Sequence, residues 1–153
     1  MMKAAATMLV VTGLLALTGA SVAEAATYKG KTSGGSTITL KRSGNAIGSI
    51  RTVVPTVCTE TTGSGLSRAG AELFQPPGRA RLGRTRKVKA LQPAALNSGS
   101  KATKNYTVRA TQSGRRVKGK LKLSYSFLRL DLFRSMPYVY LCTGSASFVA
   151  RPR

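Results

Sequence analysis

The stretch Val117-Lys-Gly-Lys-Leu-Lys-Leu-Ser-Tyr-Ser-Phe127 alternates between apolar or small residues and polar ones. A period of two is typical of a β-strand with one buried face and one face in water. Just before it, Tyr106 to Thr111 alternates in the same way, and Gln112-Ser-Gly-Arg115 between the two segments has the composition of a turn. The two segments together predict a β-hairpin.

The alternation also predicts a register for this hairpin, because its apolar side chains must share one face. With Thr111 opposite Arg116, Ala110 lies opposite Val117 and all the apolar positions point to the same side. Lysines and arginines then fill the other side, where like charges opposite one another cost a few tenths of a kcal/mol per pair.

Further strands are predicted by segments rich in β-branched and aromatic residues. These segments are Tyr28–Thr32, Ser36–Arg42, Ala46–Cys58, Tyr138–Cys142 and Ser145–Ala150. Ser33-Gly-Gly35 joins the first two as a second hairpin, and Pro55 indicates an edge or a bend in the third. Short strands, Gly/Ser turns and no helical period predict an all-β fold, either an antiparallel β-sandwich or an open barrel.

The region 61–104 has a different composition, with many Gly and Pro residues and a cluster of cations. We expect it to form long basic loops, with short strands at most at Ala71–Gln75 and Lys87–Leu91. Ala94–Asn97 is expected to form a single helical turn.

The N-terminal segment has the three parts of an export signal. Lys3 supplies a positive charge, Met8–Leu17 is apolar, and Ala23-Glu-Ala25 is a small-x-small cleavage site. The apolar part is too short to span a bilayer, so we expect a cleaved signal peptide over 1–25 and no transmembrane anchor afterwards. One domain over 26–153 remains, and we expect it to be secreted, extracellular or associated with the cell wall.

Cys58 and Cys142 are the only cysteines, and export would place them in an oxidising compartment. They are predicted to form one disulfide that closes a loop of 84 residues. A catalytic thiol would need a base to form the thiolate, and the sequence contains no histidine. Free, buried thiols are the alternative.

The composition excludes several kinds of chemistry. With 25 Lys+Arg against 4 Asp+Glu and no His, the chain has no histidine for a triad or an imidazole metal site. Three acids, Glu60, Glu72 and Asp131, remain after the signal, too few to favour acid–base catalysis or a metal. Two segments that resemble phosphate-binding loops lack an essential Gly or Ser/Thr. We expect no cofactor and no metal, although a Ser–Lys dyad stays open.

The formal charge of +21 includes a clustered run of cations in 79–89. Together with cations of the predicted hairpin, this run is the candidate polyanion-binding site, because Arg and Lys bind phosphate and carboxylate oxygens. Its residues are Arg79, Arg81, Arg84, Arg86, Lys87, Lys89, Arg109, Lys118, Lys120 and Lys122. The alternative is a solvated loop whose charge only aids solubility.

Short motifs across the chain resemble a known group of proteins. These are Tyr28-Lys-Gly-Lys-Thr32 before a Gly/Ser turn, a strand ending at Cys58, the Gly114–Gly119 hairpin and the closing Cys142-Thr-Gly144 and Ser147–Arg151. The chain is similar to small secreted two-cysteine β-sandwich proteins of actinobacteria. The resemblance implies a sandwich with one disulfide and no catalytic residues.

The sequence therefore predicts a monomeric, non-catalytic domain that binds anionic polymers or surfaces. Cell-wall polymers, anionic lipid and extracellular nucleic acid are the candidate partners, whereas export disfavours intracellular nucleic acid. A structural or protein-interaction domain of the cell envelope with incidental charge is the second hypothesis. An enzyme of unknown type is the third.

Overall fold

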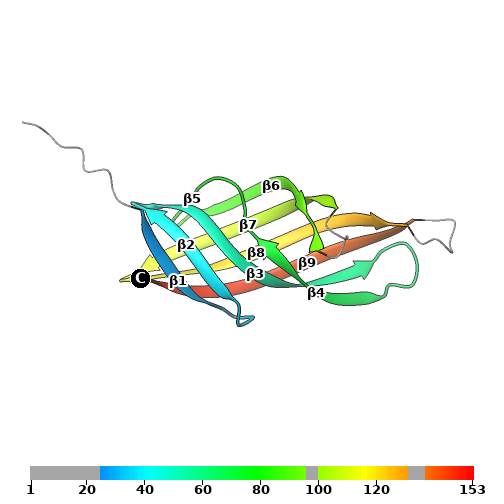
Figure 1. The fold of residues 1–153 in the computed structure, drawn as a ribbon, viewed down its shortest axis with the longest axis horizontal. Coiled ribbons are helices and arrows are strands. Elements are labelled where there is room, and N and C mark those ends of the chain that lie inside the picture. The colour runs from blue at the N-terminus through cyan, green and yellow to red at the C-terminus, as the bar shows by residue number, and fades with distance from the viewer. Residues whose placement is uncertain (1–24, 96–99, 131–136) are drawn as a thin grey trace, which may run out of the picture.

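A computed structural model describes residues 25–95, 100–130 and 137–153, and the regular structure in these residues is antiparallel β-sheet (Figure 1). The strands are β1 (Ala26–Thr32), β2 (Thr37–Ser43), β3 (Ala46–Glu60), β4 (Ser67–Phe74), β5 (Ala80–Arg81), β6 (Thr85–Pro93), β7 (Lys101–Ser113), β8 (Arg116–Arg129) and β9 (Tyr138–Pro152). The predicted all-β antiparallel class is confirmed. The predicted signal peptide over 1–25 lies almost wholly outside the described residues and stays a prediction.

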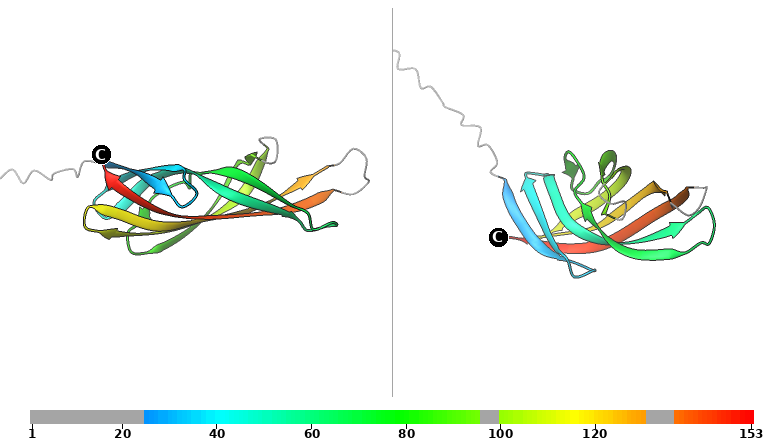
Figure 2. Two further views of the ribbon diagram at one scale, coloured as in Figure 1. Left: turned by 90° about the horizontal axis from the view of Figure 1, so that it is seen from below. Right: turned by 45° about the vertical axis from the view of Figure 1, so that its right-hand side comes forward.

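The strands form one continuous sheet in the order β4-β3-β2-β1-β9-β8-β7-β6, and the short β5 pairs with β3. Figure 2 shows from two sides that this sheet is long and strongly bent. The sequence allowed a sandwich of two sheets or an open barrel. Because the backbone hydrogen bonds join the strands into one continuous sheet, the architecture is the open barrel. In the part of the chain that the structure describes, no helix has the length and apolar character needed to cross a membrane.

Strands β3 and β9 form a fork. They pair directly between Thr56–Glu60 and Tyr140–Gly144, then separate, and the β1–β2 hairpin fills the gap between them. Pro55 lies where the ladder with β2 has ended, at Arg51, and the ladder with β9 has not yet begun. A residue without an N–H fits there, because that stretch has no ladder partner on this side. Pro55 thus lies inside the sheet, at its branch point, and not at an outer edge.

The apolar side chains gather on the inner face of the bent sheet. Most strands alternate between buried and exposed positions, and the core is drawn from the buried ones of β1–β3, β4 and β7–β9. Its largest fully buried apolar side chains are Tyr106, Tyr125, Phe74, Ile38, Leu40, Ile47, Leu121, Leu123, Val54, Val108 and Val117. The outer face is polar for most of its extent.

The predicted β7–β8 hairpin is present, but its predicted register is wrong by two residues. Ser113, and not Thr111, pairs with Arg116, so the turn is shorter than expected. Gly114, with φ of 56°, lies in the left-handed region that a tight two-residue turn requires. A shift of two keeps every side chain on its face, so the alternation alone does not distinguish the two registers.

The expectation of long loops over 61–104 is wrong, because β4, β5, β6 and the start of β7 occupy much of this region. β4 and β6 end the main strand order, and a strand at such an end pairs along one side only. Every second side chain of β6 is only partly buried, which weakens the alternation that sequence reasoning uses. The predicted helical turn at Ala94–Asn97 lies partly outside the described residues.

The two last predicted strands are one continuous strand, β9, and it carries one half of the disulfide. Cys58 on β3 and Cys142 on β9 are direct cross-strand partners, with Cα atoms 3.9 Å apart. The predicted bond is therefore confirmed. It joins β3 to β9 beside the fork and closes 84 residues of chain.

Removing the disulfide should destabilise the protein without changing its fold. The chain-entropy treatment assigns an 84-residue loop up to about 4.5 kcal/mol. The double variant C58A/C142A should therefore unfold at a lower urea concentration than the oxidised protein. An unchanged urea midpoint would show that the disulfide does not stabilise the sheet.

Candidate functional site

Both carboxylates in the described part of the chain are buried. Glu72 on β4 is 3% exposed and Glu60 on β3 is 5% exposed. The Glu60 carboxylate accepts hydrogen bonds from the backbone N–H and the hydroxyl of Ser64, at 3.2 and 2.8 Å. None of the described side-chain carboxylates therefore lies on the outer surface, where it would neutralise the cations.

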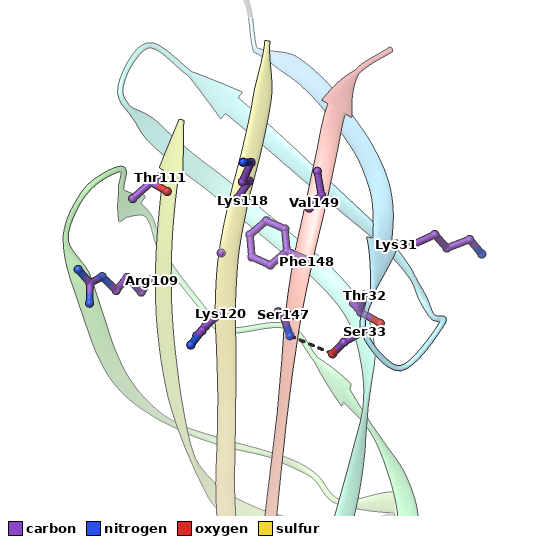
Figure 3. A pocket seen from close by; sticks show the side chains of 11 residues that line it. Lys31, Thr32, Ser33, Arg109, Thr111, Lys118, Lys120, Ser147, Phe148 and Val149 are labelled. Carbon is purple, nitrogen blue, oxygen red and sulfur yellow. Dashed lines mark hydrogen bonds between the residues drawn. The ribbon is translucent and has the colours of Figure 1, made fainter. Parts of the chain in front are cut away.

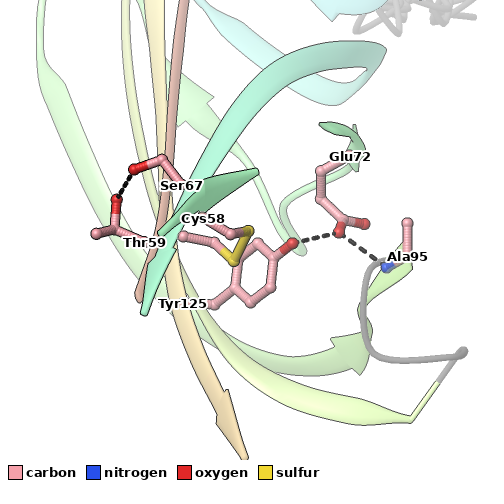
Figure 4. The surroundings of a disulfide bond; sticks show 7 residues. Cys58, Thr59, Ser67, Glu72, Ala95 and Tyr125 are labelled. Atoms are coloured by element: carbon pink, nitrogen blue, oxygen red, sulfur yellow. Dashed lines mark hydrogen bonds between the residues drawn. A yellow bond between two sulfur atoms is a disulfide. The ribbon is translucent and has the colours of Figure 1, made fainter. Parts of the chain in front are cut away.

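Glu72 forms the only ion pair among the described residues. Its Oε1 lies 2.8 Å from Nζ of Lys104, which is 1% exposed. Its Oε2 accepts hydrogen bonds from the Tyr125 hydroxyl and the Ala95 N–H, both at 2.9 Å (Figure 4). The Lys104 ammonium also lies 5.6 Å from the centre of the Tyr125 ring. A buried carboxylate needs such partners, since leaving it unpaired costs several kcal/mol.

This cluster holds the sheet together. It links β4, at one end of the strand order, to β7 and β8 near the other end, across the inner face. Because Glu72 and Lys104 are almost fully enclosed, a substrate has no direct access to them. Sequence reasoning missed Lys104, although Lys104 occupies an inward position between Ala102 and Tyr106 in the β7 alternation.

The cluster changes the acidity of two tyrosines. Burial, helped by the negative charge of Glu72, raises the pKa of Tyr106 to about 12. Burial, the hydrogen bond to Glu72 and the same charge raise the pKa of Tyr125 well above its usual 10.0. The Tyr106 hydroxyl donates to the side-chain oxygen of Gln92 on β6.

Most of the exposed cations of the strands lie on the outer face of the sheet, whereas Arg68 and Arg129 occupy inward positions near strand ends. We call this surface the outer cationic face, and its residues are Lys29, Lys31, Lys41, Arg51, Lys87, Lys89, Lys101, Arg109, Arg116, Lys118, Lys120, Lys122 and Arg151. Two cations about 7 Å apart along a strand repel by about 0.6 kcal/mol in water. The fold holds the cations together in spite of this repulsion.

The structure brings together most of the predicted site. Arg109 pairs directly with Lys120, and Lys87 pairs with Thr107, which pairs in turn with Lys122. These residues therefore form neighbouring rows over β6, β7 and β8. Lys89 and Lys118 lie on the same face. Lys89 is the next outward residue of β6 after Lys87, and Lys118 is the outward residue of β8 before Lys120, so the two extend these rows at opposite ends.

The remaining predicted residues lie elsewhere. Arg79, Arg81 and Arg84 belong to the connection between β4 and β6, which β5 ties to the start of β3. Arg86 has the opposite orientation to Lys87, is only partly exposed and donates to the carbonyl of Pro77. The run predicted as one basic loop is therefore divided between a connection, a supporting arginine and the outer cationic face.

The outer cationic face is hollowed along β8. A shallow groove of about 680 Å³ is lined by Lys118 and Lys120 on β8, by Arg109 on β7 and by Ser147 on β9 (Figure 3). Ser33 at the tip of the β1–β2 hairpin closes one side, and its hydroxyl accepts a hydrogen bond of 3.1 Å from the Ser147 N–H.

No model of a known protein family matches the chain, and no curated protein sequence matches it. The resemblance to secreted actinobacterial β-sandwich proteins therefore stays a prediction. The evidence about function is the arrangement of the residues themselves.

Breaking the buried ion pair should be far more damaging than replacing it. Lys104→Met leaves a buried carboxylate without its cation and should cost about 3 kcal/mol or more of unfolding free energy. Glu72→Gln alone should also lower the unfolding free energy, because it leaves Lys104 buried without its carboxylate. In the double variant E72Q/K104M, the new amide oxygen can still accept a hydrogen bond from Tyr125, and the loss of unfolding free energy should be smaller than the sum of the losses in the two single variants. Urea denaturation of the four proteins measures this coupling, and additive losses would contradict it.

The raised tyrosine pKa values predict a loss of stability in alkali. Below pH 10 both phenols are protonated in the folded and unfolded chains, so the contribution of Tyr106 is fully present. Between pH 10 and about 12 the unfolded chain releases the Tyr106 proton first, and stability falls by at most about 1.4 kcal/mol per pH unit for each tyrosine. Tyr106→Phe should flatten this decline in urea midpoints measured from pH 9 to 12. An equally steep decline in the variant would contradict the assignment.

Proposed function

We propose that the protein is a secreted, non-catalytic module that binds anionic polymers through its outer cationic face. The observation that carries the proposal is the separation of charge between the two faces of the sheet. The described carboxylates are turned inward, whereas lysines and arginines of adjacent strands point outward. A surface with one sign of charge attracts polyanions and accelerates their encounter.

The cations stand on paired strands, and this supports binding of an extended partner. The β7–β8 and β8–β9 ladders fix the backbone positions of Arg109, Lys120 and Ser147 in one row. A rigid scaffold lowers the ordering cost of binding, because only the side-chain ends must be fixed.

The described acids support a role without catalysis. Glu60 and Glu72 are both committed to internal contacts, with Ser64 and with Lys104 and Tyr125. A general acid or base must reach a substrate proton. Neither carboxylate is placed to do so.

A location outside the cytoplasm fits the disulfide between Cys58 and Cys142, since such bonds persist in oxidising compartments. The export signal predicted from residues 1–25 supports the same location. The partner would then be a polyanion found at or beyond the cell surface.

An apolar patch supports a second candidate function, docking of another protein. Val53, Val57, Leu73 and Leu141 are each at least 40% exposed on the outer side of β3, β4 and β9. A protein held there through apolar contacts would stay bound at high salt, whereas a polyanion would dissociate.

Salt dependence tests the proposal. The variant K118Q/K120Q/K122Q should bind heparin, a generic polyanion, more weakly and with a slope of log affinity against log salt that is smaller by about 2. The matched control R79Q/R81Q/R84Q loses the same charge from the β4–β6 connection and should change the slope little. Fluorescence anisotropy at several salt concentrations measures both slopes.

Two results would contradict the proposal. Equal slopes in the two variants would show that total charge, and not the outer cationic face, governs binding. No measurable affinity of the native protein at low salt would exclude polyanion binding altogether and favour the apolar patch.

A further inference from the structure

One strand of the outer cationic face carries cations at every outward position over half of its length. Arg116, Lys118, Lys120 and Lys122 are consecutive outward residues of β8, and all are exposed. We call them the β8 cation row. Outward residues of a strand recur every two positions, so their Cα atoms repeat at about 6.7 Å.

Shallow hollows lie along this row, and each of its cations lines at least one of them. Arg116 lines one hollow with Arg151, and Lys118 and Lys120 line the groove of Figure 3. A further hollow lies between Lys120 and Lys122, and a larger one of about 730 Å³ continues from Lys122. A chain laid along β8 therefore meets a hollow at each cation.

Hydroxyl groups flank the row on both sides. In the strand register, Lys122 lies between Thr107 on β7 and Ser145 on β9, and Lys120 lies next to Ser147. In the described part of the chain, none of these three hydroxyls has a hydrogen-bond partner within the protein. These hydroxyls can therefore donate hydrogen bonds to the oxygens of an anion that the neighbouring lysine ammonium groups bind.

This spacing selects among polyanions. An extended covalent chain advances about 1.2 Å per backbone bond, so a phosphodiester polymer with six bonds per repeat places its phosphates about 7 Å apart. That repeat matches the β8 cation row. Inorganic polyphosphate, with two bonds per phosphate, repeats at less than half this distance by the same estimate.

The side chains around the row favour a polyol phosphate over a nucleic acid, although both have six-bond repeats. Proteins that bind single strands usually stack the bases on exposed aromatic rings. Tyr106, Tyr125 and Phe127 are buried on the inner face. Phe148 lines the groove beside Gly119, but only 3% of it is exposed, which leaves little ring surface for a base to stack on. The hydroxyl groups beside the lysines suit the hydroxyls of a polyol.

We propose that the β8 cation row binds an extended polyol-phosphate chain that runs along β8, with one phosphate at each of Arg116, Lys118, Lys120 and Lys122. This inference rests on the proposed polyanion-binding function and specifies its ligand. The phosphate charge pairs with the cation, and the flanking Ser and Thr hydroxyls donate to the remaining phosphate oxygens.

A charge-preserving variant tests the spacing. K120Q/S126K removes Lys120, one of the two inner cations of the row, and restores the charge at Ser126, an exposed outward position further along β8. The control K89Q removes one cation from β6 on the same face. Affinity for poly(glycerol phosphate) should fall about fivefold in K120Q/S126K and less in K89Q, as loss of one phosphate contact predicts. Circular dichroism verifies that each variant keeps its β-structure.

The length of the ligand provides an independent measurement on the native protein. Affinity for defined glycerol-phosphate oligomers should rise steeply up to four phosphates, one for each cation of the row, and slowly afterwards. Polyphosphate with the same number of charges should bind more weakly.

The outcomes separate this inference from the function on which it rests. If all these polyanions bind equally per charge, or if K120Q/S126K binds like the native protein, polyanion binding stands and the spaced row is refuted. Tighter binding of single-stranded DNA, or of vesicles containing phosphatidylglycerol, would refute the polyol-phosphate chain as the ligand. No binding of any probe at low salt would refute both proposals.

Discussion

The bent sheet depends on one buried carboxylate, that of Glu72. Its contacts with Lys104 and Tyr125 connect strands from opposite ends of the strand order, beside the edge-to-face contact of Phe74 on β4 with Tyr106 on β7. The same contact hides negative charge from the surface. The inward placement of Glu72 therefore both links the two ends of the strand order and keeps its carboxylate away from the outer cationic face.

The outer face follows from the geometry of a β-strand. Alternation sends each second residue outward, and the ladders align those residues across neighbouring strands. On β8 this turns a simple sequence pattern, Lys-Gly-Lys-Leu-Lys, into a line of evenly spaced cations. A basic loop would offer the same charges without a fixed spacing. The proposed preference for one polymer among others of equal charge rests on this regular repeat.

The sequence was informative where local patterns decide the structure. It predicted the β7–β8 hairpin, the faces of its strands and the disulfide between Cys58 and Cys142. It missed the hairpin register, because a shift of two residues preserves every face. It allowed only short strands at Ala71–Gln75 and Lys87–Leu91, where β4 and β6 are longer, because the alternation of these two strands is weak. The cationic face was only partly predicted. Which of the residues in 79–89 belong to it depends on how β5 and β6 pair, and tertiary contacts determine this.

The site of Lys104 illustrates a second limit. A lysine at an inward position signals a buried ion pair, but the partner lies 32 residues away on another strand. Single-sequence patterns do not identify partners at that distance. The choice of ligand is limited in the same way, because it depends on spacing between side chains that only the assembled sheet defines.

The fork between β3 and β9 affects how the chain acquires its structure. β1 is the first of the described strands along the chain, yet its neighbours in the sheet are β2 and the last of them, β9. The β1–β2 hairpin therefore lacks one of its partner strands until β9 has been synthesised. Such non-local pairing makes folding slow and leaves strand edges uncovered in the meantime. A chain truncated before its final strand would thus retain an open seam beside β1, where another polypeptide could add.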